Sequence, residues 1–91
     1  MKRFSQSKPI TNKNLEKVPG NKPGVYRIQN TKNDVLYVGK AKGGRLDDRI
    51  REHKGEISGG TRFSYRTTHS KERAENLEKR EIKLHKPRFN E

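Results

Sequence analysis

Hydrophobic residues in this chain gather into short clusters separated by polar stretches. The clusters GVYRIQ, over 24–29, and DVLYVG, over 34–39, are rich in β-branched and aromatic residues, which favour strands. The polar run NTKND between them predicts a β-hairpin with a longer loop. The segment RFSYRT, over 62–67, alternates aromatic with polar residues and predicts a third strand.

Alternation along these strands predicts which side chains share a face, because successive side chains of a strand point in opposite directions. Tyr26 and Ile28 are expected on one face of the first strand. On the second strand the expected pairs are Val35 with Tyr37 on one face and Leu36 with Val38 on the other. Two tyrosines therefore fall on neighbouring strands, each with a glycine nearby.

A first helix is predicted over 44–54, where a leucine and an isoleucine stand four residues apart. Arg45, Arg49 and His53 form the neighbouring row at the same four-residue spacing. Residues so spaced lie one above another on a helix. Arg49 and His53 are therefore expected to border the buried edge of this helix.

A second helix is predicted over 71–85, with Ser70 as its N-cap and Pro87 as its stop. At about 100° per residue its apolar positions fall on one arc. The members of this arc are Ala74, Leu77, Ile82 and Leu84.

Two carboxylates, Glu78 and Glu81, fall inside that apolar arc. An unpaired buried charge is costly, so each needs a partner. An ion pair with an arginine or lysine is the common solution, and Glu81 suits it. Glu78 either forms such a pair or holds a divalent cation.

The chain has 91 residues, which fits one small domain, and only 25% of them are hydrophobic. The apolar clusters begin after a polar, basic start. We therefore expect a flexible basic arm over 1–13 and a single domain over 14–91. The expected fold class is α+β, a small three-stranded antiparallel sheet flanked by helices.

The net charge narrows the class of binding partner, because it is formally +12 at pH 7. Such an excess favours a polyanion, and nucleic acid is the usual one. The absence of cysteine excludes disulfides and thiolate zinc sites. No apolar run suits a secretory signal or a membrane span, so we expect a cytoplasmic protein without a membrane partner.

Two strand tyrosines, an arginine and a histidine on one helix edge, and a glutamate on another helix make up a candidate constellation. Hydrolysis of a phosphodiester needs a group that takes a proton from water and a cation near the phosphoryl oxygens. It also needs a metal that offsets charge on the leaving oxygen. The same residues also suit ordinary half-buried strand aromatics and ion pairs, and spacing alone leaves both interpretations open.

Six ordered features together resemble the GIY-YIG nuclease superfamily, in particular UvrC-like nuclease domains. They are GVY over 24–26, YVG over 37–39, Arg49, His53, Glu78 and KPRFN over 86–90. The resemblance covers about residues 19–90 and implies the GIY-YIG fold. It also implies a metal-dependent DNA endonuclease that uses one Mg²⁺ or Mn²⁺ ion.

The resemblance implies roles for three residues on the tyrosine-bearing strands. Tyr26 corresponds to a tyrosine that hydrogen-bonds around the attacking water and acts as general base. The unperturbed pKa of tyrosine is about 10, so this role needs cations or a metal to lower it. Tyr37 corresponds to its companion lining the metal site, and Lys40 to a lysine that assists the base.

The remaining roles fall on the helices and the tail. Arg49 corresponds to the arginine that clamps the scissile phosphate, and His53 stands where relatives have tyrosine or histidine near the nucleophile. Glu78 corresponds to the single metal-binding glutamate. Asn90 corresponds to an asparagine that braces the site from the tail.

The sequence departs from the family pattern in three places. Both tripeptides carry valine in place of isoleucine, and the stretch before the first helix is about two residues longer than the family pattern implies. Arg45 therefore competes with Arg49 as the phosphate clamp. His69 and His85 have no family role and suit surface or capping positions.

We expect DNA affinity to come from the basic surface of the domain, the arm over 1–13, an oligomer or a recognition protein. The expected DNA contacts are Lys40, Lys42, Arg45 and Arg49. Phosphate contacts carry no sequence information, so weak sequence specificity is expected. Two alternatives remain, a non-catalytic nucleic-acid-binding protein and a small ribosome-associated RNA-binding protein. Repair, mobile-element and phage-defence roles are all compatible with the sequence.

Overall fold

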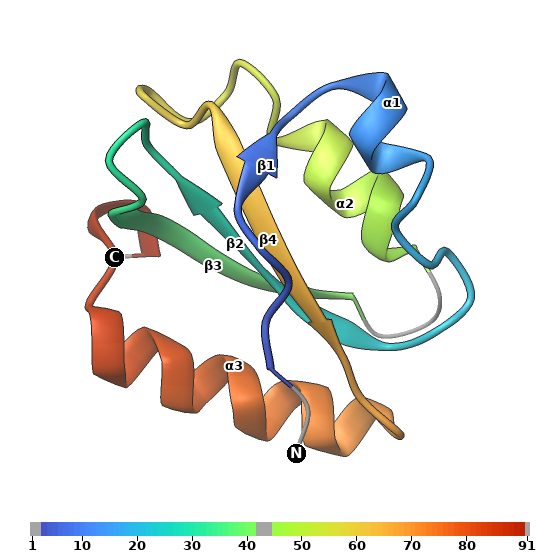
Figure 1. Cartoon of the computed structure of the whole chain (residues 1–91). Helices are drawn as coiled ribbons and strands as arrows, with labels where there is room; N and C mark the ends of the chain where they lie inside the picture. The colour runs from blue at the N-terminus through green and yellow to red at the C-terminus, as the bar shows by residue number, and fades with distance from the viewer. Residues whose placement is uncertain (1–2, 42–44, 91) are drawn as a thin grey trace.

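A four-stranded antiparallel sheet forms the centre of the protein, with helices on both of its faces (Figure 1). The computed structural model describes residues 3–41 and 45–90. The strands are β1 (Lys8–Pro9), β2 (Gly24–Gln29), β3 (Val35–Ala41) and β4 (Arg62–Thr67), in the order β1-β4-β2-β3. The helices are α1 (Asn12–Leu15), α2 (Leu46–Glu52), α3 (Lys71–His85) and the 3₁₀ turn η1 (Arg88–Asn90). The α+β class and the three predicted strands are confirmed, and β1 is a fourth strand that the hydrophobic pattern missed.

The short strand β1 belongs to the segment in which the sequence predicts a flexible arm. Lys8 stands opposite Phe63 of β4, and the Ser5 N–H donates to the Tyr65 carbonyl at 2.8 Å. Ile10 is 6% exposed and joins the core. The pattern of the segment hides this pairing, because backbone hydrogen bonds to a sheet edge need no apolar side chains.

The hairpin of β2 and β3 turns where the sequence predicts. In the turn, the Asn30 side-chain oxygen accepts hydrogen bonds from the N–H groups of Lys32 and Asp34, each at 2.9 Å. Asn33 takes the left-handed conformation with φ of 67°, which asparagine tolerates better than most residues. The turn chemistry therefore lies in the polar NTKND run.

The strand β3 contains an irregularity that corrects the predicted faces. Tyr37 stands opposite Ile28 and Val35 opposite Gln29, which leaves Leu36 as an extra residue. A bulge of this kind breaks the alternation of side chains. Leu36 and Tyr37 consequently pack together on one face, while Val35 packs with Val38 on the other. The predictions that Val35 shares a face with Tyr37, and Leu36 with Val38, are both wrong.

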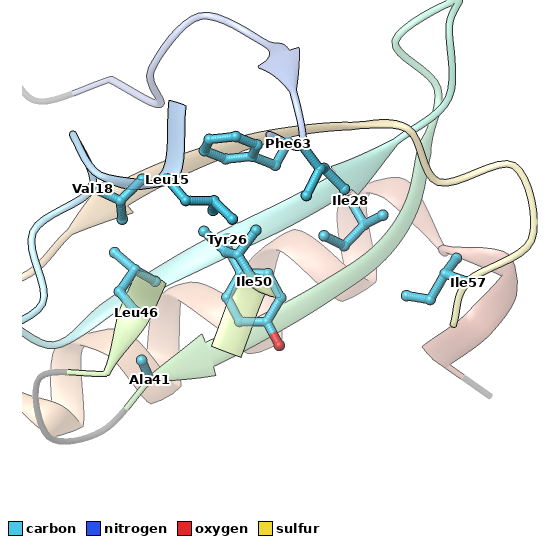
Figure 2. Close-up of a cluster of buried hydrophobic side chains, with 10 residues drawn as sticks. Leu15, Val18, Tyr26, Ile28, Ala41, Leu46, Ile50, Ile57 and Phe63 are labelled. Atoms are coloured by element: carbon cyan, nitrogen blue, oxygen red, sulfur yellow. The ribbon is translucent and has the colours of Figure 1, made fainter. Parts of the chain in front are cut away.

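Each face of the sheet has its own apolar cluster. The larger one packs α1 and α2 against the sheet, and Figure 2 labels side chains of this cluster, Tyr26 among them. Leu46 and Ile50 of α2 are completely buried in it, as their spacing predicts. The smaller cluster joins Val25 and Val38 to Ala74 of α3. The sheet therefore separates α2 from α3.

The long helix α3 has the predicted bounds and the predicted cap. The Ser70 hydroxyl accepts a hydrogen bond from the Arg73 N–H at 3.2 Å. Glu81 is buried and forms the predicted ion pair with an arginine, Arg27 of β2. Leu84 is 68% exposed, so its predicted place in the apolar arc is wrong. It lies three residues past the buried Glu81, which turns it by about 60° from the sheet-facing line.

Candidate active site

Tyr26 occupies the middle of the central strand β2 and is 2% exposed. Its neighbours across the sheet are Gly39 on β3 and Tyr65 on β4. The Tyr26 ring lies over Gly39, since a Cβ atom there would stand 2.8 Å from the Tyr26 Cε1 and closer still to its hydroxyl end. The glycine of the YVG tripeptide thus makes room for the tyrosine of GVY, and Figure 2 shows the hydroxyl projecting from the apolar cluster.

His53 follows directly after α2, as its C-cap, and lies beside both tyrosines. Its Nε2 is 2.8 Å from the Tyr26 hydroxyl oxygen. The ring centroids of His53 and Tyr37 are 4.6 Å apart, and those of Tyr26 and Tyr37 are 6.2 Å apart. The structure therefore brings three of the predicted site residues into one cluster, from β2, β3 and the end of α2.

Burial raises the pKa of Tyr26 above its ordinary value of 10.0, and the nearby Tyr37, Glu52 and Glu78 raise it further. The positive charge of Arg49 acts in the opposite direction and lowers it. The desolvation of the buried phenol dominates because water stabilises the phenolate far better than apolar surroundings do. Tyr26 with its raised pKa therefore carries its proton at neutral pH.

Lys40 and Glu78 form an ion pair between β3 and α3. The Lys40 Nζ lies 3.2 Å from the Glu78 Oε1, with the two side chains 24% and 17% exposed. Lys40 pairs across the sheet with Val25, whose side chain belongs to the cluster under α3. The pair thus lies on the α3 side of the edge strand, while Tyr26 lies on the α2 side.

Two arginines are candidates for the phosphate clamp, Arg49 within α2 and Arg45 at its N-cap. The Arg49 side chain is 53% exposed and stands 3.9 Å from the Glu52 carboxylate. Arg45 is 67% exposed and approaches Asp48 at 3.6 Å and Glu52 at 3.8 Å. Since the charge of Arg49 reaches Tyr26, Arg49 suits the site better than Arg45. Lys42, the fourth expected DNA contact, lies outside the described residues.

Asn90 attaches the end of the chain to the edge strand β3. The Val38 N–H donates to the Asn90 Oδ1, and the Asn90 Nδ2 donates to the Val38 carbonyl, both at 2.8 Å. Val38 lies between Tyr37 and Gly39, so this amide supports the backbone that carries the YVG tripeptide. Asn90 acts on the edge strand much as a further strand would.

Two acidic residues of the site were missed from the sequence. Glu52 stands beside Arg49, and the Glu56 Oε1 lies 3.7 Å from the His53 Nδ1. This nitrogen is buried and has no hydrogen-bond partner within the described residues. Each acid follows its partner by three residues, a spacing that brings side chains together on a helix and, for His53 and Glu56, in the turn that follows α2. That spacing was the available signal.

A divalent cation fits the donor chemistry around Glu78. Mg²⁺ prefers oxygen ligands and binds through one or two carboxylates while keeping several waters. Glu78 supplies one part-buried carboxylate at the edge of the sheet. The residues in 3–41 and 45–90 contain no group of three or more His, Cys, Asp or Glu placed to enclose an ion. The donor set therefore suits a hydrated ion held by one side chain.

The fold and this cluster define a class of nuclease-like domains. Residues 22–91 match the family model described as the UvrC-like GIY-YIG domain. The chain therefore belongs to the UvrC-like GIY-YIG domain family. Within the described residues no helix is long and apolar enough to cross a membrane.

Relatives of known sequence and structure agree with this membership. UvrABC system protein C of Pseudoalteromonas atlantica is 38% identical over 78 residues, covering 77% of this chain and 13% of the relative. The Clostridium acetobutylicum protein is 37% identical over 87 residues, covering 84% and 14%. The magnesium-bound GIY-YIG N-terminal endonuclease domain of UvrC from Thermotoga maritima is 28% identical, with a TM-score of 0.70 over 87% of this chain and 93% of that domain. This chain thus spans only about a seventh of the curated relatives.

Proposed function

We propose that this protein is a metal-dependent DNA endonuclease that hydrolyses one phosphodiester bond at a time. The proposal rests on the gathering of Tyr26, Tyr37 and His53 beside the edge strand that also carries the ion pair of Lys40 and Glu78. These groups come from β2, β3, α2 and α3. An ordinary apolar core has no need of such a combination.

The contact between Tyr26 and His53 suggests how a proton leaves the attacking water. Tyr26 keeps its proton at neutral pH because its pKa is raised. In the tautomer that leaves the Nε2 of His53 as an acceptor, the Tyr26 hydroxyl takes the proton of the water while passing its own proton to this nitrogen, 2.8 Å away. The Glu56 carboxylate, 3.7 Å from the Nδ1, stabilises the resulting imidazolium. In this scheme Tyr26 acts as general base without first becoming a phenolate.

The cations of the site have separate tasks. Arg49 is half exposed and has one distant carboxylate partner, so its guanidinium is available to bind the scissile phosphate. Lys40 neutralises the carboxylate of Glu78, the residue that would hold a divalent cation. Tyr37 packs on the His53 ring and holds its orientation. Asn90 keeps the backbone of the edge strand in place.

Glu78 is the residue that would hold the divalent cation. Such an ion supplies positive charge against the negative charge that develops on the leaving oxygen. A carboxylate that is already paired with an ammonium group at 3.2 Å can exchange that partner without being left unpaired. The ion pair is therefore compatible with metal binding.

DNA is the proposed substrate because the net charge is +12 and the family relatives include an endonuclease domain. Most contacts of so basic a domain fall on phosphates, which give affinity without sequence choice. We therefore propose weak intrinsic specificity, with a recognition protein supplying selectivity where it is needed. One site in the chain favours nicking over double-strand cleavage.

A plasmid assay tests the proposal, with supercoiled DNA incubated with Mg²⁺, with Mn²⁺ or with EDTA. Wild type should nick the plasmid only with metal, and Glu78→Gln should lower the rate at least about a hundredfold by removing the metal ligand. DNA affinity should stay similar. Glu72→Gln, at an exposed position on the same helix, is the matched control and should nick like wild type.

The same assay distinguishes the endonuclease from the alternative, a non-catalytic nucleic-acid-binding protein. The ion pair of Lys40 and Glu78 is compatible with both. If neither wild type nor Glu78→Gln nicks any tested DNA while both bind it tightly, the pair is structural. If Glu78→Gln unfolds the domain and cleavage per folded molecule is unchanged, the glutamate is not the metal ligand. The first result would overturn the proposed function, and the second would remove Glu78 from the metal site.

A further inference from the structure

A groove with a cavity volume of about 520 Å³ lies between the end of β4 and the N-terminal part of α3. Arg66, His69, Arg73 and Arg80 line it. No carboxylate is among the described residues that line it. The groove therefore gathers guanidinium groups at one place and has no counter-charge among the described residues that line it.

The arginines of the groove differ from the cations of the candidate active site in their partners. Lys40 and Arg49 each stand within 4.0 Å of a carboxylate. Within residues 3–41 and 45–90, Arg66, Arg73 and Arg80 form no ion pair. Three unpaired guanidinium groups around one cavity repel one another, and an anion would relieve that repulsion.

The Nε of Arg66 gives a second, independent sign of a missing partner. This atom is buried and has no hydrogen-bond partner among the described residues. A buried donor left unpaired is costly, so such a group usually has a ligand or water as its partner. Arginine presents its N–H groups in a fork that matches the oxygens of a phosphate. The chemistry of the groove therefore suits an oxyanion such as a phosphate group.

The groove is separate from the candidate active site. Arg73, Asn76 and Arg80 follow one stripe of α3, and Glu78 lies on the opposite flank, about 160° from Arg80 around the helix axis. Across the sheet, Arg66 and Lys40 are the two neighbours of Val25, roughly 10 Å apart by strand spacing. The body of α3 stands between the two sites.

We propose that this groove binds backbone phosphates of the nucleic acid at a position beyond the one being cut. The inference rests on the proposed function only for the identity of the anion as nucleic acid. Its consequence is that a substrate touching both flanks of α3 binds more tightly than one that reaches the candidate active site alone. A bent or branched DNA meets that condition more readily than a short straight duplex.

The first measurement follows the Nε–H resonance of Arg66 by NMR in EDTA, so that no cleavage occurs. The full chain is titrated with a 20-base-pair duplex or with pyrophosphate, and Arg66→Lys assigns the resonance. The duplex should shift the Arg66 signal, because the buried Nε gains an acceptor. A duplex that leaves this signal unmoved, or a shift with pyrophosphate alone, would overturn the proposal.

The second measurement compares duplex affinity as a function of salt. Arg66→Gln/Arg73→Gln should bind about tenfold more weakly, with a salt slope lower by about 2, since two phosphate contacts are lost. Lys79→Gln/Lys83→Gln removes the same charge from exposed positions of α3 outside the groove and should change affinity much less. Equal losses of affinity in the two double variants would show that only the overall charge matters, and would overturn the proposal.

A second groove variant separates a loss of binding from a loss of folding. Arg73 and Arg80 are exposed, so Arg73→Gln/Arg80→Gln serves as a second groove variant if the first is unstable. Failure of this inference is distinct from failure of the proposed function. If the protein nicks plasmid with metal but binds no duplex through the groove, only the inference about the groove is overturned. If the protein binds duplex through the groove but never nicks, only the proposed nuclease function is overturned.

Discussion

At the scale of single residues, the site depends on side chains that leave room for one another. Tyr26 crosses the neighbouring strand at the one place where no Cβ stands in its way. Its hydroxyl can then meet His53, which enters from the end of α2. The glycine of the second tripeptide therefore acts on the tyrosine of the first.

Gly39→Ala should destabilise the domain and displace the Tyr26 ring. The new methyl group would fall within 2.8 Å of the ring carbon Cε1, and overpacking of this kind costs roughly 1–3 kcal/mol. Urea unfolding measures the loss. In a Tyr26→Leu background the same change should cost much less, because the hydroxyl end of the ring is gone. Equal costs in both backgrounds would contradict the contact.

Arg49→Ala should lower the nicking rate far more than Arg45→Ala. The charge of Arg49 lies near enough to lower the pKa of Tyr26, whereas the Arg45 side chain approaches Asp48 and Glu52. Removing a cation that binds the developing phosphoryl charge typically costs about a hundredfold or more in rate. Single-turnover nicking rates of the two variants give the comparison. The reverse order would assign the clamp to Arg45.

At the scale of elements, the edge strand β3 joins both halves of the site. Its bulge at Leu36 turns Tyr37 toward the α2 side, while Val38 faces α3. Edge strands present unpaired backbone groups. Here Asn90 satisfies those of Val38. The strand is thereby held between the sheet and the tail.

Asn90→Ala should loosen this strand locally. Two hydrogen bonds of 2.8 Å are lost, each with a net contribution of roughly 0.5–1.5 kcal/mol. Hydrogen exchange of the Val38 amide should become faster, and the nicking rate should fall. Asn90→Asp retains the acceptor for the Val38 N–H, but it replaces the donor to the Val38 carbonyl with a repelling carboxylate oxygen and should therefore also speed exchange. Unchanged exchange in Asn90→Ala would show that the brace contributes nothing.

At the scale of the whole molecule, the burial of Tyr26 links global stability to alkaline pH. Its pKa is raised above the ordinary value of 10.0 when the protein is folded. Below pH 10.0 both states hold the proton, so its contribution to stability is complete. Above it the unfolded chain releases the proton and the folded chain keeps it, so stability falls as pH rises.

Tyr26→Phe should abolish that component of the pH dependence. Wild type should lose up to about 1.4 kcal/mol per pH unit more than Tyr26→Phe once the pH exceeds the ordinary tyrosine pKa. Urea unfolding of both proteins at several pH values between neutral and strongly alkaline gives the difference. Lysine titration affects the two alike and cancels. Parallel stability curves would mean that Tyr26 is accessible to water.

Much of this fold follows from local pattern. The hairpin, the strand over Arg62–Thr67 and the helix over Lys71–His85 are confirmed because each carries its own periodicity, turn or cap. The errors lie where a neighbour overrides the pattern. Strict alternation failed at Leu36, because a bulge depends on the partner strand.

What the sequence determined by itself is the set of elements, the family resemblance and the residue types of the site. Only the tertiary structure decided which of these residues touch one another. It showed which acid pairs with Lys40, which ring needs the space at Gly39, and which arginines gather around the groove. The physical reason is that hydrogen bonds, ion pairs and packing act over a few ångströms. Residues far apart in sequence come within that range only when the sheet and helices assemble.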